Sequence, residues 1–150
     1  MILHQTFDRS SYWGASGNPS AKGWAVAIKT CFDTYVDLAS SDDRRAIMTP
    51  IKRDVWLGEH SIGVAPDVVL IDPVGYVGRL VLWDTPATSQ EEAELLAGPI
   101  VIALEEELGE GRTAGVEVWH LRSGQRFYVT ADVALRRVDE ARAVLDRYVS

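Results

Sequence analysis

Two aspartates, Asp67 and Asp84, bracket a segment whose side chains predict a pair of adjacent strands. Residues 68 to 71 and 80 to 83 are continuous apolar runs, and residues 73 to 75, Pro-Val-Gly, predict the turn between them. If the two strands pair as a hairpin, the two carboxylates lie near each other. Carboxylate oxygens are the ligands that Mg²⁺ prefers. The spacing therefore predicts a divalent-metal site; the alternative is that both acids simply mark strand ends.

Other residue types give weaker indications of chemistry. The three histidines are scattered without metal-ligand spacing: His120 lies in a predicted strand and is expected to be satisfied there, and His60 in a loop is the better functional candidate. No Gly-rich phosphate loop and no Gly-x-Ser-x-Gly elbow is present. Cys31 lies on the apolar stripe of a predicted helix, which favours a buried thiol over a nucleophile.

The elements that must position the two aspartates can be read from hydrophobic periodicity and turn residues. In chain order we expect a helix over 23–39, strands over 51–57, 68–71 and 80–83, a long helix over 89–108, a hairpin over 115–130 and a helix over 132–148. Residues 40 to 45, between the first helix and the first strand, are expected to form a solvated break. The order is α-βββ-α-ββ-α. It predicts an α/β (or α+β) fold with a central mixed sheet of about five strands flanked by helices.

The long helix carries two internal signals. Thr88 followed by Glu91 matches a capping box, so the helix is expected to begin at about Ser89. Pro99 lies inside the same pattern. Because proline removes a helix hydrogen bond, we expect either a kink near Pro99 or two abutting helices.

The first 22 residues form an irregular Ser- and Gly-rich arm, and residues 23–150 are expected to form one domain. Tyr12 and Trp13 stand together in this polar arm. They either pin the arm to the domain or act as an interaction anchor for a partner, because exposed aromatic residues are frequent interface hot spots.

Composition favours protein partners over nucleic acid. Lys and Arg total 15 against 22 Asp and Glu, which gives a net charge of −7, whereas nucleic-acid surfaces depend on basic residues. We therefore expect a protein partner or a homo-oligomer, with nucleic-acid binding weak. A single cysteine, no signal-peptide pattern and no apolar run of roughly 20 residues predict a cytoplasmic protein without a membrane segment.

Four stretches follow one another in an informative order over about residues 22 to 129. They are "SAKGWAVAIKTCFDTYVDL", "IGVAPDVVLIDPVG", "GRLVLWDTP" and "EEAELLAGPIVIALEEELGEG" with the following "AGVEVWHL". Together they resemble the RecB-like branch of the PD-(D/E)xK nuclease superfamily. The resemblance implies a nuclease-like core with an opening helix, a metal-binding acid at Asp67, a strand for the second acid and the lysine, and a long helix with a returning strand.

The sequence departs from that family pattern at the positions that bind metal and carry out catalysis. The histidine of the opening helix is replaced at Ala27 or nearby. Aligning "LWDT" on Asp-x-Lys-Thr puts Leu82 at the second acid and Asp84 at the lysine; the other register makes Asp84 the acid and puts Pro86 at the lysine. The usual Gln-x-x-x-Tyr of the long helix is also missing. Losing one preorganised electrostatic group costs about 10²- to 10³-fold in rate.

Three functional hypotheses follow. The first is a non-catalytic, degenerate nuclease-like domain that acts as a protein-interaction or assembly subunit in a defence, repair or mobile-element system, with no cofactor and a vestigial site at Asp67 and Asp84. The second is an active Mg²⁺-dependent nuclease that uses the same two acids, with Arg79 or Lys52 supplying a basic residue in place of the missing lysine. The third is a small phage structural or toxin-neutralising protein, which would suit the acidic charge.

Overall fold

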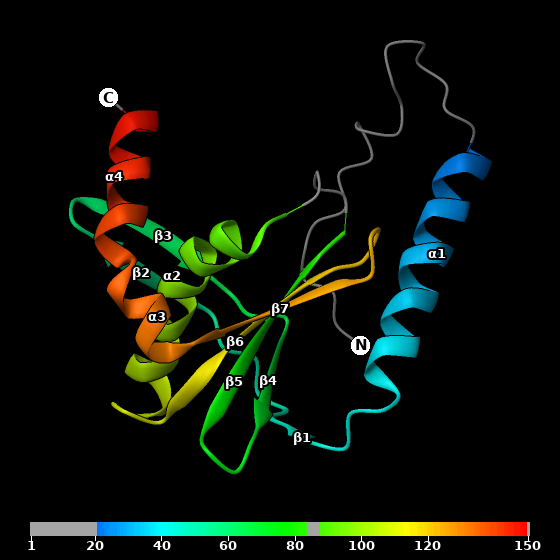
Figure 1. Ribbon diagram of the computed structural model, residues 1–150, viewed down its shortest axis with the longest axis horizontal. Coiled ribbons are helices and arrows are strands. Elements are labelled where there is room, and N and C mark those ends of the chain that lie inside the picture. Colours follow the sequence, from blue (N-terminus) through cyan, green and yellow to red (C-terminus); the bar gives the residue numbers. More distant parts are fainter. Residues whose placement is uncertain (1–20, 84–87, 150) are drawn as a thin grey trace.

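The computed structural model describes residues 21–83 and 88–149 (Figure 1). Its five-stranded mixed sheet has the order β1-β4-β5-β6-β7 and is flanked by helices, which confirms the predicted α/β fold class. A separate two-stranded sheet pairs β2 with β3. The elements are α1 (Ala21–Ala39), β1 (Arg45–Ala46), β2 (Arg53–Leu57), β3 (His60–Val64), β4 (Val68–Ile71), β5 (Tyr76–Leu82), α2 (Gln90–Leu108), β6 (Thr113–His120), β7 (Gln125–Thr130), α3 (Ala131–Arg136) and α4 (Val138–Val149).

The central strands pair as the sequence predicts. β4 and β5 form an antiparallel hairpin in which Val68 pairs with Arg79. β5 and β6 are parallel and are joined by the crossover helix α2. β6 and β7 form the second predicted hairpin, antiparallel, with its turn near Gly124. At the outer edges, the two-residue strand β1 pairs with β4, and the Gln90 side chain donates to the Tyr128 carbonyl of β7 over 3.2 Å.

The sheet region before α2 contains more strands than predicted. Residues 45 to 71 hold β1 and the β2–β3 hairpin as well as β4, where we expected one strand before 68–71. Leu57 pairs with His60, so the β2–β3 turn has two central residues, and Gly58 adopts a φ of 65° at the first of them. That is the position at which a type II′ turn requires glycine. The sequence of β3, "HSIGV", has too little apolar alternation to reveal the strand.

Three details of the helices differ from the prediction. Ser89, not Thr88, is the N-cap of α2: its hydroxyl accepts from the Glu92 N–H over 3.1 Å. Pro99 lies inside one continuous helix, so the alternative of two abutting helices is wrong. The predicted C-terminal helix is two helices, α3 and α4. The helical hydrogen bonding is interrupted at Arg137, whose N–H donates to the carbonyl of Ala134.

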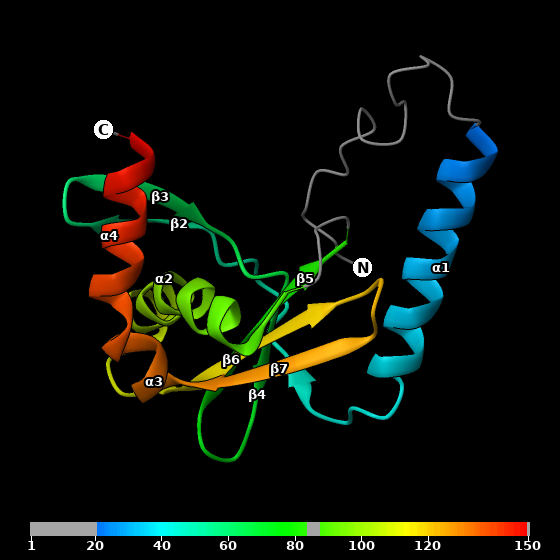
Figure 2. The same cartoon turned by 45° about the horizontal axis from the view of Figure 1, so that its top comes forward.

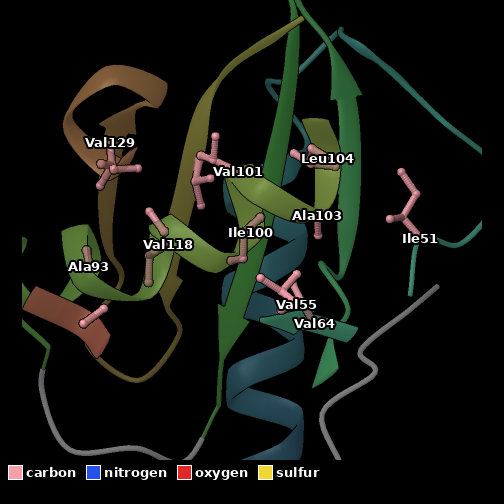
Figure 3. Packing of buried hydrophobic residues seen from close by; sticks show 14 of the residues in the cluster. Ile51, Val55, Val64, Ala93, Ile100, Val101, Ala103, Leu104, Val118 and Val129 are labelled. Carbon is pink, nitrogen blue, oxygen red and sulfur yellow. The ribbon is translucent and has the colours of Figure 1, made fainter. Parts of the chain in front are cut away.

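Helix α2 is the centre of the main core. It packs against the sheet on one side and against α3, α4 and the β2–β3 hairpin on the other, and Figure 3 shows their apolar side chains gathered together. α2 lies close to β5, since a Cβ placed on Gly78 would be 2.9 Å from Cγ2 of Ile100. Helix α1 lies on the opposite side of the sheet (Figures 1 and 2). Within the described ranges, no helix is both long and apolar enough to cross a membrane.

Candidate functional site

Asp67 sits directly before β4 and is buried. Its N–H donates to the Arg79 carbonyl over 2.8 Å, and its Oδ2 accepts from the Val81 N–H over 2.7 Å. The carboxylate therefore ties the start of β4 to the neighbouring strand β5. A carboxylate oxygen that accepts a backbone N–H is already serving the fold, which is a structural role that the spacing of the acids did not reveal.

The other predicted site residues fall outside the described ranges. Asp84 belongs to residues 84–87, and Tyr12 and Trp13 belong to residues 1–20. The convergence of Asp67 with Asp84 and the anchoring role of the aromatic pair therefore stay predictions. Leu82, which one alignment places at the second acid, is buried in the main core.

The end of β5 next to Asp67 is apolar. A second core cluster forms there from Cys31 of α1, Val81, Trp83 and Leu121, with Tyr35 packed against it. Cys31 is buried, as predicted. In the described part of the chain, no group of three or more His, Cys, Asp or Glu residues is arranged to hold a metal ion.

A network of four charged side chains lies farther along the same face of the sheet. The guanidinium of Arg79, only 3% exposed, donates to Asp42 Oδ2 over 2.7 Å and to Glu117 Oε2 over 3.0 Å. Arg44 bridges the same two acids, at 2.7 Å from Asp42 Oδ2 and 2.6 Å from Glu117 Oε1. Each buried charge is thus matched by opposite charges, the condition under which ionic groups are tolerated away from water.

Electrostatics inside this network hold Asp42 and Arg44 in their charged forms. The hydrogen bonds from Arg44, and secondarily those from Arg79, place the pKa of Asp42 far below its usual value. The same contact with Asp42, together with Glu117, raises the pKa of Arg44. The ion pairs of Asp42 and Arg44 with Arg79 and Glu117 bind the loop after α1 to β5 and β6.

Aromatic rings extend the network to α1. The Arg79 guanidinium carbon lies 3.6 Å from the centroid of the Trp119 ring, close enough for a cation–π contact. Tyr35 of α1 lies 5.6 Å from Trp119, ring centroid to ring centroid, and its hydroxyl accepts from Arg79 over 3.5 Å. An open cavity of about 450 Å³ adjoins the network, and Arg126 and Tyr128 of β7 also line it. Burial raises the pKa of the Tyr128 hydroxyl.

This network corrects two expectations. Residues 40 to 45 are not simply a solvated break, since Asp42 and Arg44 are half-buried in ion pairs. Arg79, which the nuclease hypothesis offers in place of the family's lysine, already donates its guanidinium to Asp42 and Glu117. One feature of the sequence could have indicated this network. Each of two apolar strands contains a single charged residue, Arg79 in β5 and Glu117 in β6.

The histidines of the strands have partners. His120 is buried, with Nδ1 2.6 Å from the Ser123 hydroxyl, as expected of a satisfied strand residue. Nε2 of His60 lies 2.6 Å from Oδ1 of Asp146 and so joins β3 to α4. His60, the better functional candidate by sequence, thus has a structural contact.

A scan against models of protein families finds no match, and a search of the curated proteins finds none either. Function is therefore inferred from the residues and contacts described above.

Proposed function

We propose that the chain is a non-catalytic domain on a degenerate nuclease-like core and that it works as a protein-interaction or assembly subunit. The observation that carries the proposal is the engagement of Asp67, the one family acid that the sequence retains in both alignments. Its carboxylate accepts from the Val81 N–H in a buried position next to an apolar cluster. A Mg²⁺ site would add a cation and further oxygen ligands around Asp67, whereas the contacts described for its carboxylate and N–H are to the backbone of β5.

The partner is proposed to be protein because of charge. With a net charge of −7, the chain repels a phosphate backbone, whereas an acidic surface suits a basic protein. Placement in a defence, repair or mobile-element system rests on the resemblance alone, which is an argument by fold analogy. The single cysteine favours the cytoplasm as the compartment.

A cleavage assay tests the proposal against the rival nuclease. The protein is incubated with single- and double-stranded DNA in Mg²⁺ or Mn²⁺, beside Asp67→Ala. We expect no cleavage above the buffer control from either protein. Metal-dependent cleavage that the Asp67→Ala variant loses would establish the nuclease in place of the binding domain.

Stability separates the two roles of Asp67. Asp67→Ala removes the acceptor of a buried N–H and should lower the free energy of unfolding by about 1–3 kcal/mol. Asp67→Asn, whose amide oxygen can still accept from Val81, should cost less. Urea denaturation measures both. The midpoint of thermal unfolding of the unmodified protein should not move with MgCl₂; a rise that both variants lose would indicate a metal ligand.

A toxin-neutralising or phage structural role is the second candidate, and the acidic charge favours it. Native mass spectrometry distinguishes the toxin-neutralising role from the structural role. A ring of identical subunits indicates a structural protein of a particle, and a one-to-one complex with a basic protein indicates neutralisation.

A further inference from the structure

An apolar groove of about 500 Å³ is lined by elements that lie on the other side of the sheet from α1 (Figure 2). Three elements form its walls: the β2–β3 hairpin, α2 and α4. Leu80 of the central strand β5 also lines it. The lining residues are Leu57, Ile62, Gly63, Val64, Ala65, Leu80, Leu95, Leu96, Pro99, Ile100, Ala141, Val144 and Leu145.

The groove is an accessible surface and not a sealed part of the core. Leu96 is 41% exposed, and Ile62, Leu80, Leu95 and Leu145 are each partly exposed. Its volume lies within the roughly 300–1,000 Å³ range of ligand pockets. Aliphatic side chains that converge on one hollow from three elements offer dispersion contacts and burial, and they offer few hydrogen bonds.

The charges beside the groove are mostly negative. Asp54 flanks Gly63, with Oδ1 3.7 Å from the position that a Cβ there would take. Glu92 lies one helical turn before Leu96, and Asp146 follows Leu145 directly. Of the basic residues nearby, Arg142 of α4 lies over Gly58, and Arg137 is paired with Glu91, Glu94 and Glu140. With the net charge of −7, the surroundings favour a cationic ligand.

We propose that this groove binds an amphipathic helix of a partner protein, with its apolar face in the groove and its Lys and Arg residues toward Asp54 and Glu92. The inference rests on the proposed function and names the surface and the partner chemistry for it. A helix satisfies its own backbone hydrogen bonds, so it can enter a hollow that supplies almost no polar groups. Apolar anchors at i, i+3, i+4 and i+7 fit a lining of this kind.

Synthetic peptides test the chemistry of the ligand. Three labelled peptides of about five helical turns are compared by fluorescence anisotropy: an amphipathic Leu/Lys helix, an amphipathic Leu/Glu helix, and a Leu/Lys peptide of the same composition with its apolar stripe scrambled. The amphipathic basic peptide should bind at least about tenfold more tightly than either of the others, the size of one lost hot-spot contact. Equal affinity for the two basic peptides, or no binding of any of them, overturns the proposal.

A matched pair of variants tests the location. Leu96→Glu places a charge in the groove, and Leu135→Glu makes the same change on α3 at nearly the same exposure, 42% against 41%. Both add one negative charge, so an attraction that is only electrostatic would tighten in both. We expect Leu96→Glu to weaken binding of the basic amphipathic peptide by about tenfold or more and Leu135→Glu to leave the affinity unchanged or slightly higher.

A folding control and a dye-displacement experiment complete the test. Circular dichroism and thermal unfolding confirm that each variant is folded before binding is measured. If the apolar dye 8-anilinonaphthalene-1-sulfonate binds the groove and the peptide does not displace it, the groove is a site for small apolar ligands and the proposal is wrong. A failure here leaves the DNA cleavage result untouched, so the failure of this inference and that of the proposed function are distinguishable.

Discussion

Replacing Asp42 by alanine is expected to lower the free energy of unfolding by about 3–5 kcal/mol, the usual cost of removing one partner of a buried ion pair. Asp42 is 15% exposed and accepts from both Arg44 and Arg79. Without it, the Arg79 guanidinium stays buried with only Glu117 to balance it, while Arg44 competes for the same carboxylate. Urea denaturation followed by tryptophan fluorescence measures the loss.

Asp33→Ala is the matched control for Asp42. Asp33 pairs with Lys29 at the same distance, 2.7 Å, but on the exposed surface of α1. Solvent screens an exposed pair of this kind, so this variant should be nearly as stable as the unmodified protein. Similar losses in both variants would mean that the buried network contributes no more than a surface contact.

The same network predicts how stability depends on pH. The pKa of Asp42 is lower in the folded protein than in the unfolded chain, where it lies near about 3.9. Its contribution is therefore present in full above that value and is lost as the pH falls toward the lower, folded-state pKa. Asp42→Ala should accordingly be less sensitive than the unmodified protein to a fall in pH below about 4.

Trp119→Ala is expected to cost about 3–5 kcal/mol, as large-to-small changes of a buried aromatic residue do. Trp119 is 2% exposed and contacts both the Arg79 guanidinium and Tyr35 of α1. Its removal should therefore also loosen α1 from the sheet. Hydrogen exchange measured by mass spectrometry should be faster in Trp119→Ala than in the unmodified protein, and this increase should be larger in α1 than in α2.

Trp56→Ala controls for the loss of an indole ring in itself. Trp56 lies on β2 and is 66% exposed, so its removal leaves no cavity and should change the free energy of unfolding by less than about 1 kcal/mol. If Trp119→Ala leaves the exchange of α1 unchanged, the contact between Tyr35 and Trp119 does not hold that helix.

Local patterns were enough to predict much of the sheet and its helices. The β6–β7 hairpin follows from alternating side chains and the Ser-Gly turn, and the β4–β5 pair follows from two apolar runs around a Pro-Val-Gly turn. The apolar stripe of α1 predicted a buried thiol at Cys31, and the structure confirms its burial. Such features depend on neighbours in sequence, which is where periodicity is informative.

The site depended on pairings that no local pattern contains. Arg79 meets Glu117 because β5 and β6 pair in parallel with these two residues in register, across a crossover that includes all of α2. Asp42 joins them from the loop after α1. The engagement of Asp67 by Val81 likewise requires the exact β4–β5 register, so the sequence could place the acid at a strand start without revealing its partner.

The outer strands of the sheet have a consequence for how copies of the chain behave together. Long, bare edge strands invite pairing with another molecule and lead to aggregation. Here one edge is the two-residue strand β1, and at the other a side chain of α2 occupies a carbonyl of β7. The β1 edge is thus too short to template an added strand, and a strand that paired along β7 would have to displace the Gln90 contact.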